Sequence, residues 1–78
     1  MNTKLITTEQ MLDVVKREPN EEHEVSLCMG PILRSTHWMQ YDTERGLFRN
    51  STDWIHYDWF TEAELLQLYA GQWWVWYY

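Results

Sequence analysis

The chain has 78 residues, 17% of them aromatic, and carries 6 Trp and a formal net charge of −6 at pH 7. A chain of this length forms a single domain, residues 1–78, with a small core. Its few basic residues are scattered, which argues against direct nucleic-acid binding, because nucleic-acid binders normally carry a basic face. The single cysteine, Cys28, excludes a disulfide within the chain.

The first residues lack the apolar segment of a signal peptide. No apolar run approaches the roughly 20 residues that a membrane span requires. We therefore expect a cytoplasmic protein that does not associate with membranes.

The first predicted element is a helix over residues 7–18. Thr7 is a suitable N-cap, and Gln10 stands three residues later, which is the pattern of a capping box. Pro19 ends the helix, because the residue before a proline is disfavoured in the helical conformation. The apolar residues at helical spacing form a narrow stripe: Met11, Leu12, Val14 and Val15.

Strands are predicted in the middle of the chain. Alternation of apolar and polar residues indicates a strand over residues 23–29, which Gly30 and Pro31 end. Further strands are predicted over residues 35–41, 47–49 and, as a possible fourth strand of this middle region, 54–59. Gly46 suits a hairpin loop over residues 42–46, because glycine readily adopts positive φ.

A second helix is predicted over residues 61–70, with Thr61 as its N-cap, Glu64 completing a capping box and Gly71 as its stop. The last residues, 73–78, form a strand. Alternation sends Trp74, Trp76 and Tyr78 to one face and Trp73, Val75 and Tyr77 to the other.

Both faces of this last strand are apolar, so each face requires a cover. The second helix can fold back onto one face, whereas the narrow stripe of the first helix is too small for the other. The expected fold is α+β: a small antiparallel sheet of four to five strands with two helices, in the order α-β-β-β-(β)-α-β.

The sequence does not indicate catalysis. His56 and Asp58 at i and i+2, with His37 or His23, would resemble a two-histidine, one-carboxylate metal site, but nothing fixes the third ligand. The glycines are isolated turn residues, so no phosphate-binding loop is present. We expect no catalytic residue, no metal ion and no cofactor.

The surplus of aromatic residues predicts a protein-binding patch, because exposed Trp and Tyr dominate interface hot spots. A homodimer interface or a fully buried core would also account for the surplus. The residues expected in a partner-binding patch are Trp38, Trp54, Asp53, Asp58, Trp76, Tyr77 and Tyr78.

In its shortness, acidic balance, Trp-dense end (residues 72–78) and lack of motifs, the chain resembles small acidic inhibitor proteins of phages and mobile elements. Anti-CRISPR and host-takeover proteins are of this kind; the resemblance is one of class, without an alignable motif. It implies a non-enzymatic inhibitor in the host cell cytoplasm. The implied partner is a larger, basic host protein that handles nucleic acid or acts in defence, bound through an aromatic patch ringed by acidic residues.

An alternative function is the binding of a small, preferably cationic ligand in an aromatic cage. The rings considered for such a cage are Trp38, Trp54, Trp76 and Tyr78. The cage could lie at an interface between copies of the chain.

Overall fold

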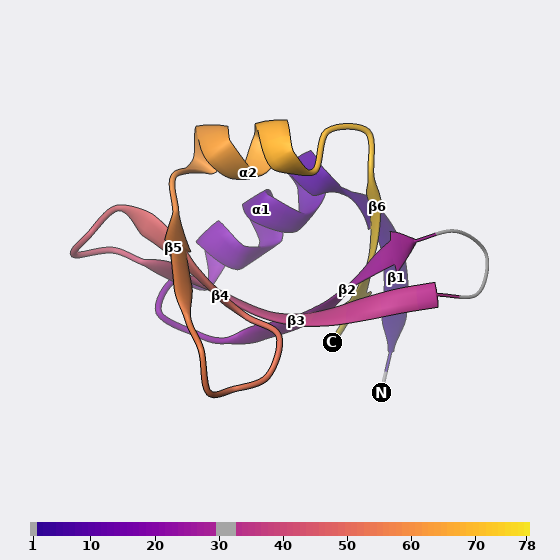
Figure 1. The fold of residues 1–78 in the computed structure, drawn as a ribbon, viewed down its shortest axis with the longest axis horizontal. Helices are drawn as coiled ribbons and strands as arrows, with labels where there is room; N and C mark the ends of the chain where they lie inside the picture. The colour runs from indigo at the N-terminus through magenta and orange to yellow at the C-terminus, as the bar shows by residue number, and fades with distance from the viewer. Residues whose placement is uncertain (1, 30–32) are drawn as a thin grey trace.

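Both helices lie on the same face of one antiparallel sheet in the computed structural model, which describes residues 2–29 and 33–78 (Figure 1). The fold is α+β, as expected, and its six strands have the order β1-β6-β2-β3-β4-β5. The elements are β1 (Thr3–Thr7), α1 (Thr8–Arg17), β2 (His23–Met29), β3 (Leu33–Asp42), β4 (Leu47–Ser51), β5 (Asp58–Phe60), α2 (Glu62–Leu68) and β6 (Trp73–Tyr77).

The two predicted helix starts are confirmed. The hydroxyl oxygen of Thr7 accepts a hydrogen bond from the backbone N–H of Gln10, and the backbone N–H of Thr7 donates to the side-chain oxygen of Gln10. Thr61 and Glu64 form a capping box of the same kind. The second helix ends at Leu68, two residues earlier than predicted. The turn into β6 then passes through Gly71, which has a φ of 71°.

The predicted number of strands, four to five, was too low. The strand that the sequence did not reveal is β1, which pairs with β6 at the far end of the chain. The strand over residues 23–29 is confirmed, and the next two extend beyond their predicted ends. The expected boundary at Gly30 and Pro31 lies outside the described residues.

The predicted strand over residues 54–59 is mostly wrong. Only β5 is a strand there; residues 52–55 form bends, and residues 56–57 are irregular. The reason is Asp53, whose carboxylate accepts hydrogen bonds from the backbone N–H groups of Ile55 and His56. These side-chain bonds take the place of a strand ladder.

The core lies between the sheet and the two helices. Its buried apolar members are Ile6, Met11, Leu12, Val14, Val15, Val25, Leu27, Met39, Phe48, Leu65 and Trp74. The apolar stripe of α1 thus packs on the same side of the sheet as Leu65 of α2, and the first helix does not cover the other face of the last strand. That last strand, β6, lies inside the sheet between β1 and β2.

Candidate functional site

The candidate site is the face of the sheet that points away from both helices, which we call the open face. Directly opposed residues of antiparallel strands share a face. Leu5 opposes Val75, Val75 opposes Ser26, and Ser26 opposes Thr36, so one row of the open face crosses four strands. The aromatic residues of the strands on this face are Trp38, Trp59, Trp73 and Tyr77.

Two residues at the centre of the open face are buried although no helix covers them. Ser26 is hydrogen bonded to Thr36 Oγ1 at 3.2 Å and donates to the hydroxyl of Tyr77 at 3.1 Å. Val75, its neighbour on β6, is 7% exposed. Trp73, at one side of this centre, is 49% exposed. The face therefore combines a closed centre with exposed apolar groups around it.

The loop between β4 and β5 places a further indole over this face. The ring centroids of Trp54 and Trp38 are 4.4 Å apart, yet Trp54 remains 59% exposed. Its φ is 65°, in the left-handed region, which costs a residue with a side chain roughly 1–2 kcal/mol. The backbone N–H of Trp54 donates to Ser51 Oγ at 2.8 Å and so helps to hold this backbone conformation.

The same loop is fastened by one carboxylate. Asp53 Oδ1 accepts from the backbone N–H groups of Ile55 and His56 at 2.9 and 2.8 Å. Its Oδ2 lies 2.7 Å from His56 Nδ1. The hydrogen bond to the imidazole holds the pKa of Asp53 well below its usual range and raises the pKa of His56 above 6.5.

Two arginines stand among the aromatic rings at the β4–β5 end. The guanidinium of Arg45 lies 4.7 Å from the ring centroid of Trp59, and that of Arg49 lies 4.4 Å from the ring centroid of Tyr57. These distances are typical of cation–π contacts. Arg45 also forms a 2.9 Å ion pair with Asp42. The open face is therefore aromatic with mixed charges rather than uniformly acidic.

The structure divides the predicted site residues between the two sides of the sheet. Trp38, Trp54 and Tyr77 lie on the open face, where Trp38 contacts Trp54, and Asp53 holds the loop that carries Trp54. The other three lie on the helix side: Trp76 stacks on Tyr78 at 4.5 Å, and Asp58 opposes the buried Asn50. Within one copy of the chain, Trp38 and Trp54 therefore do not line a common pocket with Trp76 and Tyr78. An aromatic cage made of all four rings would need more than one copy.

Sequence reasoning missed several residues of the open face. Trp73 could have been found, because strand alternation places it on the same face as Val75 and Tyr77. Leu5, which is 58% exposed, could not have been found, because the sequence did not reveal the strand in which it lies. The remaining missed residues are Tyr57, Trp59, Arg45 and Arg49.

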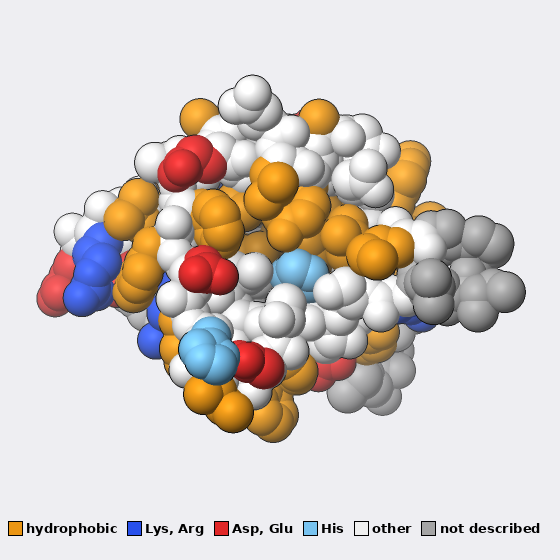
Figure 2. Space-filling view, in the orientation of Figure 1, with side chains coloured by type: hydrophobic (Ala, Val, Ile, Leu, Met, Phe, Trp, Pro, Cys, Tyr) orange, Lys and Arg blue, Asp and Glu red, His pale blue; other side chains and the backbone are white. Residues whose placement is uncertain are grey.

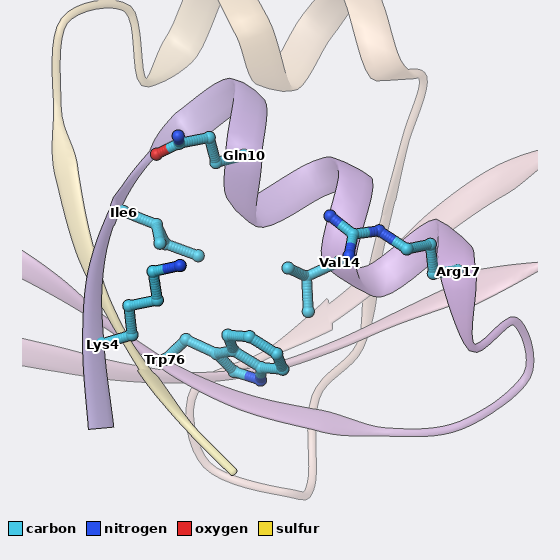
Figure 3. A pocket seen from close by; sticks show the side chains of 6 residues that line it. All are labelled: Lys4, Ile6, Gln10, Val14, Arg17 and Trp76. Carbon is cyan, nitrogen blue, oxygen red and sulfur yellow. The ribbon is translucent and has the colours of Figure 1, made fainter. Parts of the chain in front are cut away.

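The helix side contains two hollows. A shallow one beside α2 is lined by Phe60, Glu64, Gln67 and Leu68, and a band of hydrophobic side chains lies beneath that helix (Figure 2). A smaller cleft of about 110 Å³ lies between β1, β6 and α1 (Figure 3). Its lining residues are Lys4, Ile6, Gln10, Val14, Arg17 and Trp76.

The histidines belong to separate hydrogen-bond networks. His23 Nε2 lies 3.3 Å from the carbonyl oxygen of Glu18, and His37 Nδ1 lies 3.0 Å from Asn50 Oδ1. Among residues 2–29 and 33–78, no three His, Cys, Asp or Glu side chains gather as metal ligands would. Within the same part of the chain, no helix has the length and apolar character that crossing a membrane requires.

No protein-family model, curated protein or solved structure matches this chain.

Proposed function

We propose that this chain is a non-enzymatic protein-interaction module that binds a larger protein through the open face. The observation that supports this most strongly is Trp54, a large apolar side chain left 59% exposed on a backbone with positive φ. Conformations of this kind cost stability and concentrate at functional sites. A tryptophan placed in this way over Trp38 has the properties of an interface anchor.

The size of the open face suits a protein partner. Six strands about 4.8 Å apart, all but the three-residue β5 at least five residues long, cover on the order of 500 Å² before the relief of side chains is counted. A standard interface buries roughly 800 Å² per partner. A face of this size fits a protein surface better than it encloses a small molecule.

The partner that we propose is a basic host protein that handles nucleic acid, bound and inhibited as the class resemblance implies. The net charge of −6 attracts such a protein over long distances and accelerates encounter. At short range, Glu24 opposes Trp38 in the sheet and offers a carboxylate beside the aromatic rings. The aromatic rings supply most of the binding free energy, and the charges increase the rate of association and orient the partner.

The test compares substitutions on the two sides of the sheet. Tagged wild-type protein is used to capture its partner from an extract of the native host, and the dissociation constant of the identified pair is measured by calorimetry. Trp54→Ala and Trp73→Ala should each weaken binding about tenfold or more, as expected for hot-spot residues.

Leu68→Ala is the matched control, because Leu68 lies on α2 and is 58% exposed, almost the same fraction as Trp54. It should leave the affinity unchanged. Equal losses from the open-face and α2 substitutions, or no loss from either open-face substitution, would show that the open face is not the binding surface.

A further inference from the structure

The outer edge of β1 carries unpaired backbone groups. The backbone N–H of Asn2 donates to the carbonyl of Tyr78 at 2.8 Å, and the N–H of Tyr78 donates back at 2.9 Å. Hydrogen-bonded and non-bonded pairs alternate along an antiparallel ladder, so the even-numbered residues of β1 bond to β6. Thr3 and Leu5 therefore direct their N–H and C=O groups outward, where no strand of the described chain pairs with them.

The next residue along this edge supports the assignment. The backbone N–H of Thr7 also points away from β6, and it donates to Gln10 Oε1 at 2.9 Å in the capping box of α1. The free edge thus ends where the helix begins. Between these limits, residues 3–5 offer two donors and two acceptors, which suits the addition of a short strand.

A basic cleft adjoins this edge on the helix side. Lys4 projects into it from β1, Arg17 extends over it from α1, and the indole of Trp76 forms its floor (Figure 3). Among the described residues, neither Lys4 nor Arg17 has a carboxylate within 4.0 Å, whereas Lys16 and Arg45 do. In an acidic chain, two cations without such partners beside one small cleft favour an anionic group there.

We propose that the outer edge of β1 binds an extended acidic peptide segment of another protein, which adds a seventh strand to the sheet. The residue that pairs with Leu5 exchanges two backbone hydrogen bonds with it and lies beside Leu5 on the open face. The neighbouring residue of the peptide points to the helix side, where its carboxylate reaches Lys4 and the cleft below Arg17. The segment therefore alternates apolar and acidic residues.

A second copy of the chain fits this edge less well. Antiparallel pairing of two β1 strands about Leu5 would place both Lys4 side chains on the same side as diagonal neighbours, roughly 7–8 Å apart. Repulsion between the two Lys4 ammonium groups at that distance opposes pairing of two β1 strands, whereas an acidic residue of a peptide would be attracted to Lys4. The inference concerns an edge of the sheet and does not depend on what binds the open face.

The experiment uses a defined probe, the acetylated and amidated peptide Thr-Val-Glu-Val-Glu-Val-Thr, and the same peptide with Gln in place of both Glu. Binding to the full chain is followed by the shifts of backbone amide resonances. The largest shifts are expected at Thr3 and Leu5, and the Glu peptide should bind about three to ten times more tightly than the Gln peptide.

Two variants separate the backbone and charge contributions. Leu5→Pro removes an outward N–H without removing a bond to β6, so the Lys4–Trp76 pairing should persist while the peptide binds at least about tenfold more weakly. Lys4→Gln should weaken binding of the Glu peptide severalfold and leave the Gln peptide unaffected.

Each of several results would overturn the inference. These are equal binding of the two peptides, unchanged binding by Leu5→Pro with its β1–β6 pairing intact, and amide shifts confined to β3, β4 and β5 or to α2. A wild-type dimer that Leu5→Pro converts to a monomer in sedimentation would assign the edge to a second copy instead. None of these results bears on Trp54, so failure here leaves the proposed function to its own test.

Discussion

The indole Nε1–H of Trp74 donates to the hydroxyl oxygen of Thr8 at 2.9 Å in the centre of the core. That hydroxyl in turn donates to the carbonyl oxygen of Tyr69 at 2.7 Å. Trp74 and Thr8 are 0% and 1% exposed. One hydroxyl therefore joins β6, the first residue of α1 and the end of α2, and it satisfies the only polar hydrogen of the buried indole.

Replacing Thr8 by Val should lower the free energy of unfolding by about 1–3 kcal/mol, because the Val side chain leaves the Trp74 N–H without an acceptor in the core. Chemical denaturation measures the change. Thr8→Ser is the control, since it retains the hydroxyl and loses only a methyl group, which costs about 1 kcal/mol or less. Equal or greater stability of the Val variant would show that the hydrogen bond has no net effect.

Trp54 should show an unusual order of stability among its variants. Gly and Ala both remove the indole, but only Gly adopts a φ of 65° without a steric penalty. Trp54→Gly should therefore be more stable than Trp54→Ala by about 1 kcal/mol, the reverse of the order expected at an ordinary position. Thermal or denaturant unfolding of the two variants gives the difference.

The positive φ can be checked against a neighbouring position in the same loop. Ile55 is 75% exposed and has no positive φ, so Ile55→Gly should be no more stable than Ile55→Ala. If Trp54→Ala is as stable as Trp54→Gly or more stable, the positive φ at residue 54 does not destabilise the native fold.

The parts of the fold that the sequence revealed are those with local causes. Both capping boxes depend on residues three positions apart, and the strand over residues 23–29 is evident from its own alternation. β1 was missed because residues 3–7 become a strand only by pairing with β6, about 70 residues away. The loop over residues 52–57 was misread because its aromatic residues favour a strand, whereas the Asp53 carboxylate accepts hydrogen bonds from backbone N–H groups that a strand would donate to its neighbour.

The candidate site was only partly predictable for the same reason. Alternation correctly separated Tyr77 from Trp76, but a local pattern does not say which face the helices cover. Asp58 was grouped with Trp54 because a strand over residues 54–59 would place both on one face, and only residues 58–60 are a strand. Trp76 and Tyr78 were grouped with Tyr77 although alternation itself places them on the opposite face. The placement of both helices on one face is a property of the chain topology, and it determines which rings are exposed.

Asp53 and His56 predict a pH window for the order of the loop. His56 has a raised pKa, so its contribution is complete below 6.5, the ordinary value, and is lost as the pH rises through the folded value. Asp53 has a lowered pKa, so its contribution is complete above 3.8 and is lost as the pH falls through the folded value. The loop should thus be best ordered between about pH 4 and 6.5.

NMR titration of the His56 ring tests this coupling, with Asp53→Asn as the variant. In that variant the pKa of His56 should move back toward 6.5, and the amide resonances of Ile55 and His56 should show increased exchange. An unchanged His56 titration in Asp53→Asn would mean that the 2.7 Å contact between the two side chains does not persist in solution.

His37 should make the whole domain sensitive to acid. It is 5% exposed, with Asn50 Oδ1 at 3.0 Å from Nδ1, Ser35 Oγ at 3.1 Å from Nε2, and the Trp74 ring against its edge. Burial lowers the pKa of His37 below 6.5, so the unfolded chain takes up the proton more readily. The free energy of unfolding should therefore fall as the pH drops below 6.5, by up to about 1.4 kcal/mol per pH unit.

Denaturant unfolding at a series of pH values between 7 and 5 measures this slope. His37→Gln removes the titrating group and should make the slope shallower, whereas His56→Gln should preserve the slope or make it steeper, because the raised pKa of His56 acts in the opposite direction. If the two variants lose the same part of the slope, the acid sensitivity does not arise from the buried imidazole. If neither loses any, protonation of His37 is not coupled to unfolding.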